Sequence, residues 1–202
     1  MLPASVLIPL GVGAYTRAYA QPGLQSIYLY LVVGGITNVV ARAVGAAHLN
    51  NLPLLHIYTI LELLLLLRYY RTLVRGKYVV LGIQALYWLF PVLAVLNFLL
   101  LQSIFTFNSY PRALASVIVV GLSLHFFFRE EGSFSANQAN RWINVGLLQY
   151  FGSAAFMFAF SNIIYQHVSP QGQNVLGITH ATLVLLMYLL FALGFFYARP
   201  SR

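Results

Sequence analysis

The sequence contains no cysteine and no aspartate, and its only acidic residues are Glu62, Glu130 and Glu131. A chain without cysteine has no disulfide, thiolate nucleophile, iron–sulfur cluster or cysteine-based zinc site. With three acidic residues in all, paired-carboxylate hydrolysis and carboxylate-rich calcium or magnesium sites lack their ligands. We therefore expect no metal site and no cofactor.

Apolar residues dominate the chain. Hydrophobic residues make up 60% of it and charged residues only 7%, against the usual quarter or so, and the mean hydropathy is +0.81. Several stretches of about twenty residues carry no charge, which is the length of a helix that crosses a bilayer. The composition therefore predicts an all-α fold, a polytopic transmembrane helical bundle.

We predict seven spans in a single domain that covers residues 1–202. The loops between the spans are short and contain turn residues, so none is long enough to fold separately. The first span is the shortest, and six spans remain if it does not cross. The predicted spans are Pro3–Tyr15, Leu24–Ala47, Pro53–Leu67, Tyr78–Leu101, Ala113–Phe128, Trp142–Gln166 and Asn174–Ala198. Arg68, Tyr69 and Tyr70 extend the third span, because their side chains can reach the membrane interface.

The basic residues predict the orientation, since short loops rich in Lys and Arg stay in the cytoplasm. With the N-terminus outside and the C-terminus inside, nine of the eleven basic residues lie on the cytoplasmic side: Arg17, Arg68, Arg71, Arg75, Lys77, Arg129, Arg141, Arg199 and Arg202. Only Arg42 and Arg112 lie elsewhere. The net charge of +8 thus reflects membrane topology, and we expect no nucleic-acid partner.

Polar groups at membrane depth are the best functional signal, because each costs free energy there. Asn51 and Pro53 suit the start of a helix at the outer surface. Counted from there, Glu62 lies roughly 14 Å deep, close to the midplane, and His56 lies roughly 5 Å deep. Tyr58 and Thr59 precede Glu62 by four and three positions, so they share its face of the helix.

A cation should lie near Glu62, the only acidic residue in any predicted span. Asn38 and Arg42 share one face of the second span, and a guanidinium stays charged there. We therefore predict that Arg42 and Glu62 approach each other, directly or through water or a ligand. Asn162 near the end of the sixth span and His180 in the seventh complete a cluster in the outer half.

This cluster has two interpretations: a polar network that fixes helix register, or a water-accessible pocket that opens outward. The predicted ligand-binding residues are Asn38, Arg42, His56, Tyr58, Thr59, Glu62, Asn162 and His180. Two histidines and a carboxylate can also bind a metal, but His56 and Glu62 are six residues apart and point about 120° apart around a helix.

One segment resembles a known sequence pattern. The run from Asn50 to Leu64, which reads NNLPLLHIYTILELL, is similar to N-N-L-x-L-x-H-I-Y-T-x-x-E-F-L-L in a family of small, functionally uncharacterised bacterial multi-pass membrane proteins. The resemblance covers about half of the chain and implies no activity. It marks His56, Tyr58, Thr59 and Glu62, whereas the family often has an acid at the position of Asn38.

Three functions fit these observations. The first is a non-enzymatic protein of a bacterial inner membrane that binds a small polar or anionic ligand in an outward-facing pocket, as a sensor or transport component. The second is a structural or accessory subunit of a larger membrane complex, in which the polar network serves assembly. The third is an intramembrane enzyme that uses Glu62 with a histidine. Membrane lipids are expected partners in each case, and the second function adds a protein partner.

Overall fold

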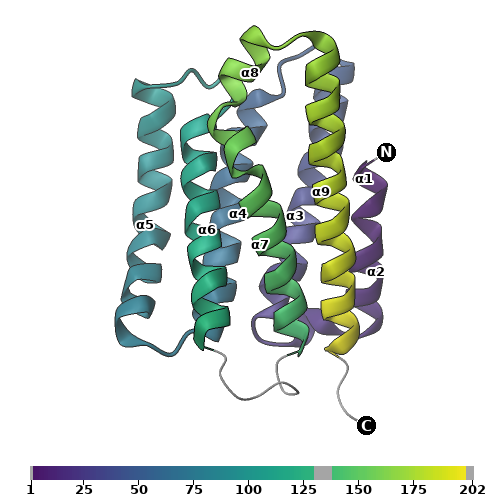
Figure 1. Ribbon diagram of the computed structural model, residues 1–202, viewed down its shortest axis with the longest axis vertical. Coiled ribbons are helices and arrows are strands. Elements are labelled where there is room, and N and C mark those ends of the chain that lie inside the picture. The colour runs from purple at the N-terminus through teal and green to yellow at the C-terminus, as the bar shows by residue number, and fades with distance from the viewer. Residues whose placement is uncertain (1, 130–137, 199–202) are drawn as a thin grey trace.

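The computed structural model describes residues 2–129 and 138–198, and every regular element within these ranges is helical (Figure 1). The long helices run side by side as an upright bundle. The elements are α1 (Leu2–Ser5), α2 (Leu7–Tyr15), the 3-10 turn η1 (Ala18–Ala20), α3 (Leu24–Ala46), α4 (Leu52–Leu73), α5 (Lys77–Leu100), α6 (Ser109–Arg129), α7 (Gln138–Ala159), α8 (Ser161–His167) and α9 (Pro170–Tyr197).

Five of these helices, α3, α4, α5, α6 and α9, are long and apolar enough to cross a membrane. A sixth span is formed if α7 and α8 are taken together, although the two are bent by 55° at the break between them. This architecture is compatible with a multi-pass integral membrane protein. The predicted first span, Pro3–Tyr15, consists of the two short helices α1 and α2, and the predicted sixth span is the broken pair.

Local sequence sets where the helices begin. Pro170 occupies the first turn of α9, and the Ser169 hydroxyl accepts a hydrogen bond from the Gly172 N–H at 3.3 Å, as a helix cap does. Pro111 lies in the first turn of α6, where its missing N–H costs nothing. As a result α6 starts at Ser109, four residues before the predicted start of that span.

The predicted interfacial role of Tyr69 and Tyr70 is wrong. Helix α4 continues to Leu73, and both tyrosine side chains are fully buried within the bundle. Tyr70 shares a 2.6 Å hydrogen bond with Ser123 of α6, and the Tyr69 hydroxyl accepts one of 2.9 Å from Asn144 of α7. Tyrosine hydroxyls with polar partners inside the protein do not need the interface to satisfy them.

Helix α7 lies at the centre of the packing. It contacts α6 on one side and α9 on the other, while α3 packs against α4, and α2 packs against α9. Beyond the polar contacts of Tyr69 and Tyr70, apolar side chains predominate in the next turns of α4 and α7 toward the middle of the bundle. The fully buried side chains of this apolar layer are Leu63, Leu66, Leu147 and Phe151.

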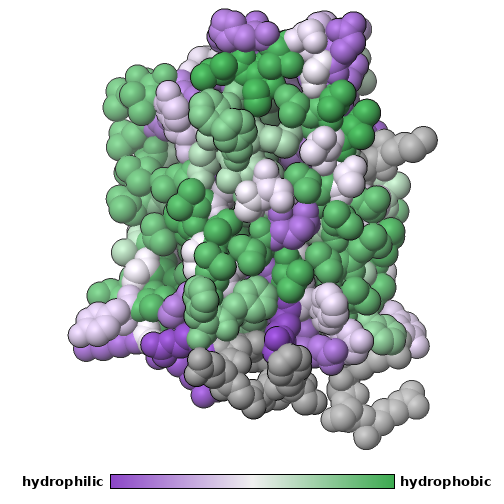
Figure 2. Space-filling model, viewed as in Figure 1, coloured by the Kyte–Doolittle hydropathy of each residue, from purple (hydrophilic) through white to green (hydrophobic). Residues whose placement is uncertain are grey.

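The basic residues gather at one end of the bundle, the lower end in Figures 1 and 2, where η1, the α4–α5 loop, the end of α6 and the start of α7 meet. The described members of this basic end are Arg17, Arg68, Arg71, Arg75, Lys77, Arg129 and Arg141. Short helix α8 lies at the opposite end, which we call the α8 end. The flank between the two ends is mainly apolar in Figure 2.

Gly23 joins η1 to α3 and is expected to tolerate no side chain. Its φ of +85° and ψ of −60° are rarely adopted by L residues, and an added Cβ would lie 2.5 Å from the Thr72 hydroxyl oxygen. Gly23→Ala should therefore destabilise the protein by about 2 kcal/mol, measured as a lower unfolding temperature in detergent. Gly82→Ala in α5, where an added Cβ meets nothing within 4 Å, is the control, and equal unfolding temperatures for the two variants would contradict the expectation.

Candidate functional site

Arg112 is the central residue of the site. It lies about one turn inside α6, whose first turn is attached to α4 by Asn108: the Asn108 side-chain amide donates to the Leu55 carbonyl at 3.1 Å and to the Thr59 hydroxyl at 2.6 Å. The guanidinium carbon of Arg112 lies 4.3 Å from the centre of the Phe158 ring. This stacking arrangement is typical of arginine on an aromatic face, and it fixes the plane of the guanidinium group.

A chain of hydrogen bonds leads from Arg112 to α9. Arg112 Nη2 donates a long hydrogen bond of 3.5 Å to the Tyr150 hydroxyl, which is hydrogen bonded at 3.1 Å to His180 Nε2. The Arg112 Nε is buried and has no hydrogen-bond partner in the protein. Because a guanidinium carries five N–H donors, the protein contacts given for Arg112 leave part of its hydrogen-bonding capacity unsatisfied.

Glu62 lies in the middle of α4 and is only 1% exposed. The Tyr30 hydroxyl donates to its Oε1 at 3.2 Å, while Oε2 is buried and makes no hydrogen bond of ordinary geometry. Tyr58 lies beside the same carboxyl group, and Arg112 is the cation that acts on it electrostatically. The two charges do not form a contact ion pair: within the described ranges no arginine or lysine nitrogen lies within 4.0 Å of the carboxylate.

The predicted direct approach of Arg42 to Glu62 is wrong. Arg42 is exposed near the end of α3, and Arg112 takes the role assigned to it. The reason is that the buried residues of α3 all lie between Leu24 and Gly34. Within the last turns of α3, Thr37, Asn38 and Ala41 face the smaller cavity described below, whereas the Arg42 side chain is exposed.

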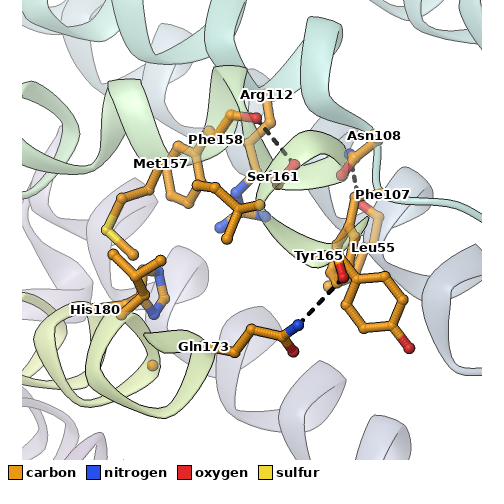
Figure 3. Close-up of a pocket in the computed structure, with 13 residues that line it drawn as sticks. Leu55, Phe107, Asn108, Arg112, Met157, Phe158, Ser161, Tyr165, Gln173 and His180 are labelled. Carbon is orange, nitrogen blue, oxygen red and sulfur yellow. Dashed lines mark hydrogen bonds between the residues drawn. The ribbon is translucent and has the colours of Figure 1, made fainter. Parts of the chain in front are cut away.

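Two cavities meet at Arg112. The larger has a volume of about 480 Å³ and lies between the α7–α8 bend and α9, with α4 and α6 behind it. Its apolar lining is Leu55, Phe107, Met157, Phe158, Ile164 and Leu176. Figure 3 shows Arg112, Phe158 and Met157 on one side of this cavity, and Gln173 and Tyr165 across from them. Its volume falls within the ~300–1,000 Å³ of ligand pockets.

The smaller cavity has a volume of about 230 Å³ and lies between α3, α4, α7 and α9. Arg112, His180 and Leu55 line both cavities. Polar residues make up a larger share of the lining of the smaller one, which includes the tyrosines Tyr30, Tyr58, Tyr150 and Tyr188 together with Thr37 and Asn38. The two cavities therefore place an apolar space and a polar space on either side of one guanidinium group.

The predicted site residues separate into three groups. Asn38, Tyr58 and His180 line the smaller cavity, and Glu62 lies beside Tyr58. Arg42 lines neither cavity. The third group consists of His56, Thr59 and Asn162. Their side chains make hydrogen bonds to the loop between α5 and α6.

The contacts of this third group are structural. His56 Nε2 is 3.0 Å from the Thr106 carbonyl, and Asn162 on α8 donates to the Phe107 carbonyl at 2.9 Å while its own oxygen accepts from the Phe107 N–H at 3.2 Å. The ring nitrogens of His56 and His180 are hydrogen bonded to Thr106 and Tyr150, respectively, and not to Glu62. Within residues 2–129 and 138–198, no group of three or more His, Asp or Glu residues is arranged to hold a metal ion.

The sequence reasoning missed Arg112, Tyr30, Tyr150 and Tyr188. A signal for Arg112 was present, because Pro111 is favoured in the first turn of a helix and so places the next residue inside α6. No such signal marks the tyrosines, which follow the same apolar helix pattern as the residues around them.

Comparison of the chain with models of protein families, with curated proteins and with solved structures gives no match.

Proposed function

We propose that this protein is a non-enzymatic membrane protein that binds a small polar or anionic ligand in a pocket within its helical bundle, as a sensor or transport component. One observation carries the proposal: Arg112 stands between two cavities with an unpartnered Nε and no carboxylate in contact with it. A half-buried guanidinium that lines two cavities favours an anion, and it offers paired donors to a carboxylate or phosphate group.

The topology that goes with this proposal has seven spans, with the N-terminus outside and the C-terminus inside a bacterial inner membrane. Its support is the collection of basic side chains at the basic end of the bundle, since the cytoplasmic side is rich in Lys and Arg. In this arrangement α1 and α2, which pack against α9, form a broken first span. The α8 end faces outward, and so do the two cavities.

Native mass spectrometry of the protein gently extracted from its own membrane tests the proposal. We expect a small mass at fixed stoichiometry that is retained in Arg42→Gln and lost in the double variant Glu62→Gln/Arg112→Gln. Arg42→Gln is a matched control, because Arg42 is an exposed arginine that lines neither cavity. The double variant removes both buried charges together, so that neither is left uncompensated.

Two results would contradict the proposal. The first is the absence of any stoichiometric small mass from the wild-type protein. The second is a bound mass that the double variant retains in full. A bound protein of defined stoichiometry in place of a small mass would favour the second function, a subunit of a larger membrane complex.

A further inference from the structure

The two cavities differ in chemistry in a way that describes a ligand with two parts. The smaller one presents hydroxyl groups, His180 and Arg112, whereas the larger one is lined mainly by aliphatic and aromatic side chains. Arg112 and His180 belong to both. A purely polar ligand would have no apolar group to fill the larger cavity. A purely apolar ligand would leave the Arg112 guanidinium without an anion.

The larger cavity also has a side that faces the flank of the bundle. The cavity lies at the 55° bend between α7 and α8 and is lined on this side by the end of α7 and the first half of α9. Gly177 lines the cavity from α9, is exposed, and would have nothing within 4 Å of an added Cβ. The flank formed by α7 and α9 faces the viewer in Figures 1 and 2 and is mainly apolar.

At the α8 end, by contrast, a polar side chain links α8 to α9. Gln173 in the first turns of α9 donates hydrogen bonds to the Tyr165 carbonyl at 3.2 Å and to the Val168 carbonyl at 2.9 Å. Figure 3 shows Gln173 reaching toward Tyr165 along one side of the cavity. The rim at the α8 end is thus held together, while the flank between α7 and α9 is not bridged at Gly177.

We propose that the ligand is a single-chain anionic amphiphile, whose head group binds Arg112 in the smaller cavity and whose alkyl chain lies in the larger one. This inference rests on the proposed function and adds the chemical class of the ligand. A cavity of about 480 Å³ lies in the lower half of the range of ligand pockets, which favours one chain over two. The ligand enters from the surrounding lipid, between α7 and α9.

The test uses the full chain in lipid nanodiscs and a dodecanoate that carries a photoreactive diazirine near its methyl end. We expect cross-links to Met157, Ile164 or Leu176. Unlabelled dodecanoate should compete at a free concentration at least about a hundredfold lower than acetate does, because each buried CH₂ contributes a factor of roughly four. Dodecan-1-ol, which has the chain without the charge, should compete weakly.

Variants separate the head-group site from the chain site. Glu62→Gln/Arg112→Gln should lower labelling about tenfold or more through loss of charge-assisted hydrogen bonds. Met157→Trp should lower labelling by dodecanoate about tenfold, the loss expected when about two methylene groups are excluded. The matched control is Phe156→Trp, because Phe156 is the next residue on α7, is 69% exposed and lines neither cavity.

The outcomes distinguish this inference from the proposed function. If acetate or another small anion competes as well as dodecanoate and Met157→Trp has no effect, the amphiphile is wrong while an Arg112-dependent pocket remains. If vesicles of a two-chain anionic phospholipid compete better than dodecanoate, the single chain is wrong. If no anion labels or competes in an Arg112-dependent way, both proposals fail. Competition by dodecyl phosphate compared with dodecanoate identifies the head group.

Discussion

Replacing Arg112 with glutamine is expected to lower the free energy of unfolding by about 3 kcal/mol, and by much less when Glu62 is already glutamine. In the single variant the carboxylate of Glu62, which is 1% exposed, loses the cation that acts on it. Removing one member of a buried charge pair typically costs ~3–5 kcal/mol. We expect a cost at the lower end of this range because the two charged groups are more than 4.0 Å apart.

The effect of the two single variants should be unequal. Arg112 is partly exposed and lines both cavities, so water or a ligand can compensate its charge when Glu62 is removed. Glu62 has no such access. Glu62→Gln alone should therefore cost less than Arg112→Gln, and Arg112→Lys, which keeps the charge, should retain most of the stability.

A double-mutant cycle in detergent, with unfolding followed by circular dichroism, measures this coupling. Arg42→Gln serves as the control and should be close to neutral, as expected for an exposed side chain. If the effects of Glu62→Gln and Arg112→Gln simply add, the two charges are not coupled, and the electrostatic account of the site is wrong.

Gly194→Leu is expected to prevent stable packing of α9 against α7. A Cβ at Gly194 would lie 2.9 Å from the Ala139 carbonyl oxygen and 2.9 Å from two carbons of Ile143. One of these contacts is with the backbone of α7, which cannot rotate away as a flexible side chain can. Overpacking typically costs ~1–3 kcal/mol, and we expect the upper limit or more because two helix backbones must separate.

Size-exclusion chromatography and thermal unfolding of the purified variant test this expectation. Gly121→Leu in α6 is the control, because an added Cβ there meets nothing within 4 Å, and it should elute and unfold like the wild type. A Gly194→Leu protein with unchanged elution and unfolding temperature would show that α7 and α9 do not approach as closely as described.

The class of fold could be predicted because it depends on composition and on the lengths of apolar stretches, both of which a sequence states directly. The helices α3, α4, α5, α6 and α9 match predicted spans within a few residues. The break in the sixth predicted span could not be predicted, because Phe160 and Ser161 contain neither proline nor glycine to mark it. The break depends instead on tertiary contacts, such as those of Asn162 with the α5–α6 loop.

The positions of some candidate site residues in the fold could be predicted for the same kind of reason. Depth along a helix follows from counting residues, so Glu62 is correctly placed in the middle of its span, and Tyr58 is correctly placed on its face. Which cation lies near Glu62 depends on which helices are neighbours and where they diverge. Choosing between Arg42 and Arg112 required that knowledge, and counting alone favoured the wrong one.

The apolar layer formed by Leu63, Leu66, Leu147 and Phe151 has a consequence for permeation. On α4, Leu63 and Leu66 stand between Glu62 and the tyrosines Tyr69 and Tyr70, whose hydrogen bonds lie near the basic end. If the protein is a transport component, a solute bound at Arg112 would have to pass this layer to reach the basic end, so translocation would require α4 and α7 to part. A receptor could instead keep the layer closed throughout its cycle.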